Sequence, residues 1–119
     1  MQTNLPSVLK RCAIYTRKST NSRLEHEVIS LTTQHEICSA FIVSQSYRNW
    51  TLVARRYDDG RHSSSGLERP ALATLMHDVE AGEIDMVVVY KIDRLTRSLL
   101  DFVRLVDMFD RRSVGLVSV

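Results

Sequence analysis

The stretch "IDMVVVY" at residues 84–90 is the clearest strand in the sequence. Its run of β-branched residues is unbroken, and such a run suits a strand that is buried on both faces. Strands of that kind belong to parallel sheets that carry helices on either side. The stretch therefore predicts an α/β fold, and the segments around it decide how the sheet is built.

Apolar extended runs alternate with segments of helical period on both sides of this strand. Pro70 suits the first turn of a helix, and Gly82 suits the end of the same helix. The predicted strands cover 12–15, 50–57 and 84–90, with a fourth from 114, and the predicted helices cover 27–44, 70–80 and 98–112. This order predicts an open, mostly parallel sheet with right-handed crossovers and helices on both faces.

The last predicted helix begins with a capping signature, because Ser98 is followed three residues later by Asp101. Its apolar residues recur at helical spacing and are expected to face the sheet. The residues expected to be buried are Leu99, Phe102, Val106 and Phe109.

Length and composition limit the class of protein. A chain of 119 residues makes one domain at most. Residues 1–9 show no periodicity and are predicted to form a flexible leader before a domain at 10–119. With 44% hydrophobic and 25% charged residues the composition is that of a soluble globular protein. The net charge of +2 is too small to indicate a partner, so the placement of the cations matters more than their sum.

The cysteines indicate a reducing compartment. Cys12 and Cys38 match neither a zinc spacing nor a CxxC motif. Each lies among apolar residues, so we expect buried, reduced thiols. The sequence also lacks a signal-peptide core and an apolar stretch long enough to span a membrane. We therefore expect a cytoplasmic protein that is neither exported nor inserted in a membrane.

Cations and hydroxyls follow the predicted strands. In open α/β sheets the working site lies at the carboxyl ends of the strands. Arg17, Lys18 and Ser19 follow the first strand, and a loop rich in Ser, Asp and Gly follows the second. The third strand is followed by "KIDRLTR" at 91–97. These segments are therefore the candidates for a functional site.

The arginines of "KIDRLTR" suit a phosphate. Arg94 and Arg97 are three residues apart, so a helical turn would place both guanidiniums on one side. Together with Arg17 they could bind a phosphodiester and stabilise a pentacoordinate transition state without a metal. The alternative is a solvated basic start of a helix. Asp93 could orient a guanidinium, handle a proton or form a surface ion pair, and spacing does not decide between these roles.

Two polar side chains have more than one interpretation. Gln34 lies on the apolar stripe of its helix, where a buried amide must bond either a neighbouring backbone or a polar site. Ser19 could be a nucleophile among cations, or it could cap a helix or form a turn. The octapeptide "AIYTRKST" at 13–20 alone favours the cap or turn. The serines at 63–65 are expected to be solvated in a loop.

Other kinds of site lack their motifs. The sequence contains no GxxxxGK[ST], no GxGxxG and no GxSxG, which excludes the usual nucleotide-binding loops and the hydrolase elbow. Its four histidines are dispersed without metal spacing. Asp58 and Asp59 are poor candidates for a magnesium site, because no third carboxylate matches them.

Four blocks together carry a family resemblance: "YTRKS" at 15–19, "SLTTQ" at 30–34, "YDDGRHSSSGLERPAL" at 57–72 and "VVVYKIDRLTRS" at 87–98. The sequence resembles the catalytic domain of the serine recombinases, the resolvase and invertase family of site-specific DNA recombinases. It is most similar to the large members, which include phage integrases and transposon or cassette recombinases. The resemblance implies a three-layer, resolvase-like α/β domain.

The resemblance also implies the chemistry. Ser19 matches the nucleophile that attacks a DNA phosphate, giving a 5′-phosphoserine and a free 3′-hydroxyl. The matching arginines around the phosphate are Arg17, Arg94 and Arg97, and the supporting polar residues are Asp93, Gln34 and Arg69. The family uses no metal and no small-molecule cofactor. How Ser19 loses its proton does not follow from these residues.

The implied partners are double-stranded DNA and further copies of the full-length protein, as a dimer or tetramer, in a bacterial or phage-encoded, nucleoid-associated setting without a membrane. The resemblance further implies that 10–119 stops before a long dimerisation helix and separate DNA-binding domains, so these residues alone would fold but not recombine DNA. One alternative is a non-catalytic DNA-binding or regulatory module derived from a recombinase. A flavodoxin-like phosphate-binding protein is disfavoured, because its glycine-rich loop is missing.

Overall fold

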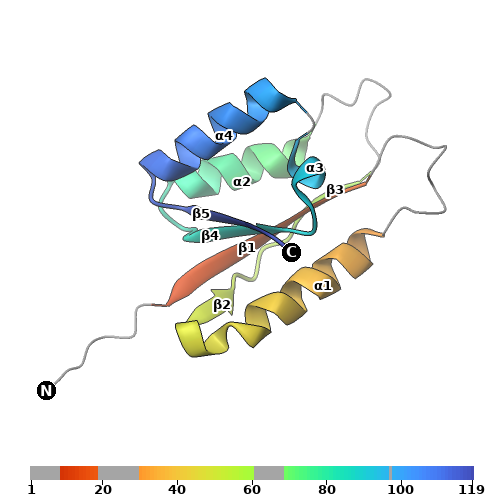
Figure 1. Cartoon of the computed structure of the whole chain (residues 1–119), viewed down its shortest axis with the longest axis vertical. Helices are drawn as coiled ribbons and strands as arrows, with labels where there is room; N and C mark the ends of the chain where they lie inside the picture. Colours follow the sequence, from red (N-terminus) through yellow and green to blue (C-terminus); the bar gives the residue numbers. More distant parts are fainter. Residues whose placement is uncertain (1–8, 19–29, 61–68, 97) are drawn as a thin grey trace, which may run out of the picture.

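The computed structural model describes residues 9–18, 30–60, 69–96 and 98–119. One sheet runs through the middle, with helices on both of its faces (Figure 1). In chain order the elements are β1 (Lys10–Arg17), α1 (Leu31–Ser44), the 3₁₀ turn η2 (Ser46–Arg48), β2 (Trp50–Leu52), β3 (Tyr57–Asp59), α2 (Pro70–Glu80), β4 (Met86–Val89), α3 (Ile92–Leu95), α4 (Leu99–Arg111) and β5 (Gly115–Ser118). None of the described helices is long and apolar enough to cross a membrane.

All strand pairs in the sheet are parallel. The strand order is β2-β1-β4-β5, and β3 pairs with the far end of β1. The prediction of an open parallel sheet with helices on both faces is confirmed. Because parallel neighbours end at the same edge, this topology brings the residues after β1, β3 and β4 together.

The prediction of one continuous strand over 50–57 is wrong. Cys12 pairs with Leu52 and Tyr15 pairs with Tyr57, so five steps along this segment match only three steps along β1. Two extra residues cannot stay in a regular ladder, and the chain leaves the sheet between β2 and β3. The result is a short β3 whose last residue, Asp59, lies opposite Arg17.

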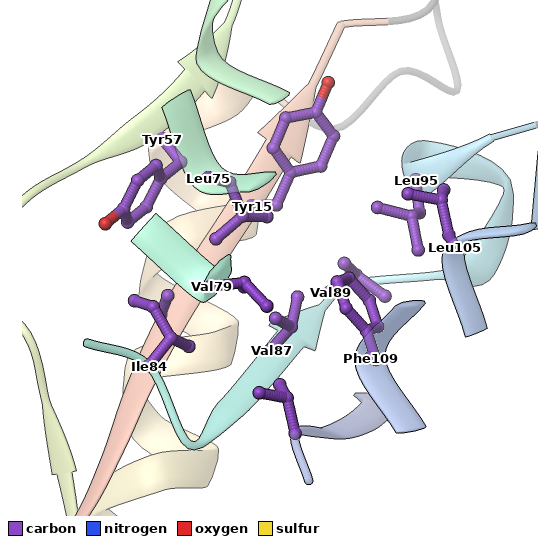
Figure 2. Packing of buried hydrophobic residues seen from close by; sticks show 12 residues of the cluster. Tyr15, Tyr57, Leu75, Val79, Ile84, Val87, Val89, Leu95, Leu105 and Phe109 are labelled. Carbon is purple, nitrogen blue, oxygen red and sulfur yellow. The ribbon is translucent and has the colours of Figure 1, made fainter. Parts of the chain in front are cut away.

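The two faces of the sheet are covered by different helices. Cys38 and Ile42 of α1 pack on one face against Ile14 of β1 and Val88 of β4. The opposite face carries α2 and α4, whose buried residues pack against Tyr15 and the other valines of β4 (Figure 2). The three valines of β4 have no exposed surface, which confirms the prediction from "IDMVVVY" of a strand buried on both faces.

Side-chain caps start two of the helices. The Ser98 hydroxyl accepts a hydrogen bond from the Asp101 N–H, so the predicted cap of α4 is confirmed. In α1 the cap is Ser30, whose hydroxyl accepts from the Thr33 N–H. Because Ser30 is extended, with ψ at 161°, α1 begins after it and not at Glu27 as predicted; residues 27–29 lie outside the described part.

The predicted buried stripe of α4 is also wrong in part. Leu105 and Phe109 are buried, whereas Leu99 is 77% exposed, and Phe102 and Val106 are only half-buried. At about 100° per residue, Leu99 lies roughly 120° around the helix from Leu105. The buried face of α4 is therefore centred on Leu105 and Phe109, and Leu99 lies outside it.

Candidate phosphate-binding site

Two arginines meet at the carboxyl end of α3. Arg17 is the last residue of β1, and its Nε donates to the carbonyl oxygen of Arg94 over 2.9 Å. Arg69 directly precedes α2, and its Nη2 donates to the same oxygen over 3.4 Å and also to the carbonyl of Leu95. The last carbonyls of a helix have no partner within it, so they are natural acceptors for these guanidiniums. The carbonyl oxygen of Arg94 thus accepts hydrogen bonds from both Arg17 and Arg69.

Arg94 itself is buried, with only 9% of its surface exposed. Its Nε has no hydrogen-bond partner among the residues that the structure describes. Leaving a buried donor unsatisfied costs about 1–3 kcal/mol, more for a charged group. A buried donor of this kind is a candidate to bind an acceptor from outside the described residues.

Gln34 binds the backbone of Arg17. Its side chain is fully buried, Oε1 accepts from the Arg17 N–H over 3.4 Å, and Nε2 donates to the Arg17 carbonyl over 3.2 Å. Of the two interpretations of the sequence, the bond to a neighbouring backbone is therefore the one observed. That backbone lies at the candidate site, so Gln34 links α1 to the arginines.

Tyr15 and Asp59 are site residues that reasoning from sequence missed. The Tyr15 hydroxyl donates to Asp59 Oδ2 over 2.6 Å and accepts from Arg69 Nε and Nη2 over 3.2 and 3.1 Å. The Arg69 guanidinium also lies over the Tyr15 ring, 5.5 Å from its centroid. The signal in the sequence was a tyrosine in a buried strand, since its hydroxyl requires a partner.

The structure does not place the side chains of the remaining predicted residues. Ser19 and Arg97 lie outside the described residues. Asp93 belongs to α3, but its side chain is not described. The predicted helical turn from Arg94 toward Arg97 stops early, because α3 ends at Leu95 and Thr96 is extended, with φ −165° and ψ 153°.

Arg69 also lines a cleft of about 610 Å³. The cleft runs between α2 and α4, and apolar residues form most of it, with Asp101 as its other charged residue. A wall of that composition does not suit a phosphate. Within the described part of the chain, no three His, Cys, Asp or Glu residues lie together in a way that could hold a metal ion.

The guanidiniums of Arg17 from β1 and Arg69 before α2 therefore both bind the backbone carbonyl of Arg94 in α3, at one edge of a parallel sheet. Each guanidinium is a permanent cation with donors that match phosphate oxygens. Fold and site together define an α/β domain with a cluster of arginines at the carboxyl edge of its sheet, a candidate site for a phosphate.

The comparison with known families makes this class specific. The chain belongs to the family described as the resolvase N-terminal domain, whose sequence profile matches residues 12–119. It is 34% identical over 110 residues to the protein named "Putative DNA recombinase" of Bacillus subtilis (strain 168). That match covers 90% of this chain but 20% of the relative, so the chain spans about a fifth of the relative's length.

Solved structures agree with this assignment. The N-terminal catalytic domain of TP901-1 integrase has a TM-score of 0.70 and 34% identity, and the match covers 92% of this chain and 76% of that one. A resolvase family site-specific recombinase from Streptococcus pneumoniae has a TM-score of 0.73 and 26% identity, with 92% and 72% covered. The catalytic domain of an IS607-like serine recombinase, 21% identical with a TM-score of 0.63 over 91% of this chain and 68% of that one, shares the fold. The predicted family and fold class are confirmed.

Proposed function

We propose that this domain cleaves and rejoins double-stranded DNA at specific sites through a covalent phosphoserine. The Ser19 hydroxyl oxygen attacks the phosphorus and loses its proton. The bond from phosphorus to the 3′ oxygen breaks, and this oxygen leaves with a proton as a free 3′-hydroxyl. The 5′ end stays on Ser19 as a phosphodiester until a 3′-hydroxyl attacks it and restores the serine.

The observation that carries the proposal is the Nε of the buried Arg94, which has no partner among the described residues, in a residue whose backbone carbonyl binds both Arg17 and Arg69. A phosphodiester supplies the acceptor oxygens that this donor lacks. Attack on phosphorus builds up negative charge on the same oxygens, and preorganised guanidiniums stabilise that charge more in the transition state than in the ground state.

The backbone that leads to Ser19 supports its role as the nucleophile. Arg17 is held by Gln34, and the Lys18 N–H donates to the Asp59 carbonyl over 3.0 Å. Ser19 is the next residue, so the chain is fixed up to its neighbour. Fixing the approach of a nucleophile lowers the entropic part of the barrier.

The other residues take supporting roles in the proposal. Arg97 adds a further guanidinium to the phosphate, and Asp93 orients an arginine or handles a proton. The domain acts within a longer, self-associating recombinase on DNA in the cytoplasm. We expect the 119 residues alone to bind DNA weakly and in a salt-sensitive way, because binding would rest on ion pairs between arginines and phosphates.

The test is to trap the covalent intermediate. The full recombinase is mixed with its recombination-site DNA, stopped with denaturant and separated by size. We expect a 5′-linked protein–DNA adduct that disappears in Ser19→Ala and persists in Ser63→Ala, the control hydroxyl. DNA binding without any adduct would instead favour the non-catalytic DNA-binding module, and an adduct that survives Ser19→Ala would refute the assignment of the nucleophile.

A further inference from the structure

We propose that Tyr15 and Asp59 are positioning residues for Arg69, with the Tyr15 hydroxyl as the link between the Asp59 carboxylate and the Arg69 guanidinium. The inference rests on the proposed function, because it assigns these residues to the orientation of one phosphate-binding arginine. Neither side chain is proposed to touch the DNA.

The Tyr15 hydroxyl makes all three hydrogen bonds that a phenol can form. A phenol has one donor and two acceptor positions. The donor goes to Asp59 over 2.6 Å, and the acceptors receive Nε and Nη2 of Arg69. These contacts fix both the position and the plane of the guanidinium, since two nitrogens of one rigid fork share an acceptor. Arg69 can therefore rotate only by breaking them.

Asp59 also fixes the backbone next to Arg69. Its Oδ1 accepts from the Ala71 N–H over 2.8 Å, and its Oδ2 accepts from the Leu72 N–H over 3.1 Å. These N–H groups belong to the first turn of α2 and have no acceptor within the helix. One carboxylate, 1% exposed, thus caps α2 and holds Tyr15. The side chain of Arg69 and the helix that follows it are anchored to the same group.

The protonation state of Tyr15 suits this role. Burial and the hydrogen bond to Asp59 raise the pKa of the Tyr15 phenol far above its ordinary value of 10.0. Tyr15 therefore stays a neutral donor at physiological pH. The Tyr15 phenol therefore keeps its donor proton in the range where the enzyme would work.

The chain contains a matched control for this arrangement. Tyr57 is the register partner of Tyr15 on β3, is also buried, and donates to Asp78 Oδ2 over 2.7 Å. Arg55 pairs with the same carboxylate at 3.3 Å. Loss of the Tyr57 hydroxyl is thus chemically the same change, on the same face of the sheet, at a carboxylate that the structure does not join to Arg69.

The first part of the test needs no DNA. Solvent exchange of the Arg69 Nε–H proton is followed by NMR in the 119-residue chain, with the signal assigned by its loss in Arg69→Lys. We expect Tyr15→Phe to speed this exchange at least about tenfold, because a bonded acceptor is removed. Tyr57→Phe should leave the exchange unchanged. Equal exchange in unaltered protein and Tyr15→Phe would overturn the proposal.

The second part measures formation of the covalent adduct by the full recombinase at saturating DNA. Tyr15→Phe should lower the single-turnover rate about tenfold or more with unchanged DNA affinity, because a misplaced guanidinium costs rate. Tyr57→Phe should match the unaltered rate, and Tyr15→Phe should add nothing in an Arg69→Lys background. Equal rates for the two tyrosine variants would overturn the positioning role. Absence of an adduct from the unaltered protein would contradict the proposed function, while the NMR result would still decide whether Tyr15 holds Arg69.

Discussion

The side-chain amide of Gln34 bonds both backbone polar groups of Arg17, with its oxygen 3.4 Å from the nitrogen and its nitrogen 3.2 Å from the carbonyl oxygen. A helix on one face of the sheet is thereby tied to the last residue of β1. The amide is fully buried, so the bonds form without competition from water. The backbone two residues before Ser19 is fixed by a side chain that no DNA needs to touch.

Replacement of Gln34 by leucine should therefore cost both stability and rate. The variant leaves the Arg17 N–H and carbonyl without this buried partner, which costs about 1–3 kcal/mol in the free energy of unfolding. Urea unfolding measures this loss, and adduct formation measures the effect on rate. Thr32→Ala on the exposed side of α1 is the control and should change neither quantity. A leucine variant as stable and as fast as the unaltered protein would show that the two bonds have no effect.

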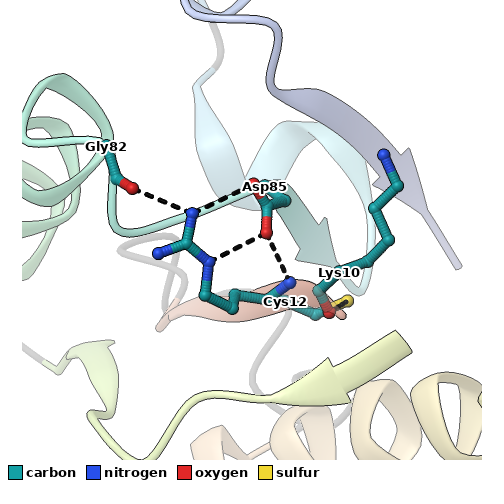
Figure 3. Close-up of polar contacts among 5 residues, drawn as sticks. Lys10, Cys12, Gly82 and Asp85 are labelled. Carbon is teal, nitrogen blue, oxygen red and sulfur yellow. Dashed lines mark hydrogen bonds and ion pairs between the residues drawn. The ribbon is translucent and has the colours of Figure 1, made fainter. Parts of the chain in front are cut away.

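The ion pair between Arg11 and Asp85 should make stability depend on pH in acid. The carboxylate accepts from the backbone N–H, Nε and Nη2 of Arg11, and Nη2 also donates to the Gly82 carbonyl (Figure 3). The hydrogen bond from Arg11 is the main cause that lowers the pKa of Asp85 below its ordinary value of 3.8. The carboxylate thus stabilises the fold fully above that value, and the stabilisation is lost as pH falls through the lower pKa of the folded state.

Asp85→Asn tests this dependence. Since Arg11 is 45% exposed, the contribution is expected to stay below about 1 kcal/mol. Unfolding free energies measured from pH 7 to pH 2 should fall less steeply in the variant below about pH 4. Asp107→Asn, in an exposed ion pair with Arg111, should keep the slope of the unaltered protein. An unchanged slope in Asp85→Asn would exclude Asp85 as its source.

Substitutions at the two residues with positive φ that follow α2 and α4 should change stability in opposite directions. Gly82 follows α2 with φ at 79°, and Ser113 follows α4 with φ at 58°. A Cβ at Gly82 would meet no atom within 4 Å, so Gly82→Ala reports backbone strain alone and should destabilise by about 1 kcal/mol. Ser113→Gly relieves the same strain and should raise the melting temperature. If both variants melted at the same temperature as the unaltered protein, neither backbone position would be strained.

Both cysteines should be unreactive in the folded protein. Burial raises the pKa of the Cys12 thiol to about 11 and that of the Cys38 thiol to about 12. Only the thiolate reacts with disulfide reagents, and it is rare at pH 8 in both cases. A colorimetric thiol assay should detect neither cysteine before denaturation and both cysteines after it. Rapid labelling of one thiol in the native protein would contradict its burial.

The sequence was sufficient for the elements whose signal is local. The valines of β4, Pro70 at the start of α2 and Ser98 at the cap of α4 each act through their own backbone or neighbours. The break between β2 and β3 could not be predicted in this way, because it arises from the register against β1, which is a contact between distant segments.

The residues of the candidate site likewise fall into those that the sequence predicts and those that it does not. Position at the strand ends pointed to Arg17 and Arg94, and an amide on an apolar stripe pointed to Gln34. Tyr15 and Asp59 were missed because each looks ordinary in its own segment. Their role follows only from a hydrogen bond between residues 44 positions apart.

In the proposed mechanism, Ser19 becomes covalently bound to the 5′ end of cleaved DNA. The direct measurement is mass spectrometry of the trapped adduct after nuclease and trypsin digestion, with fragmentation to locate the nucleotide phosphate. We predict the modification on Ser19 in the peptide "STNSR" at 19–23. A phosphodiester on any of the serines at 63–65, or on another residue, would refute Ser19 as the nucleophile.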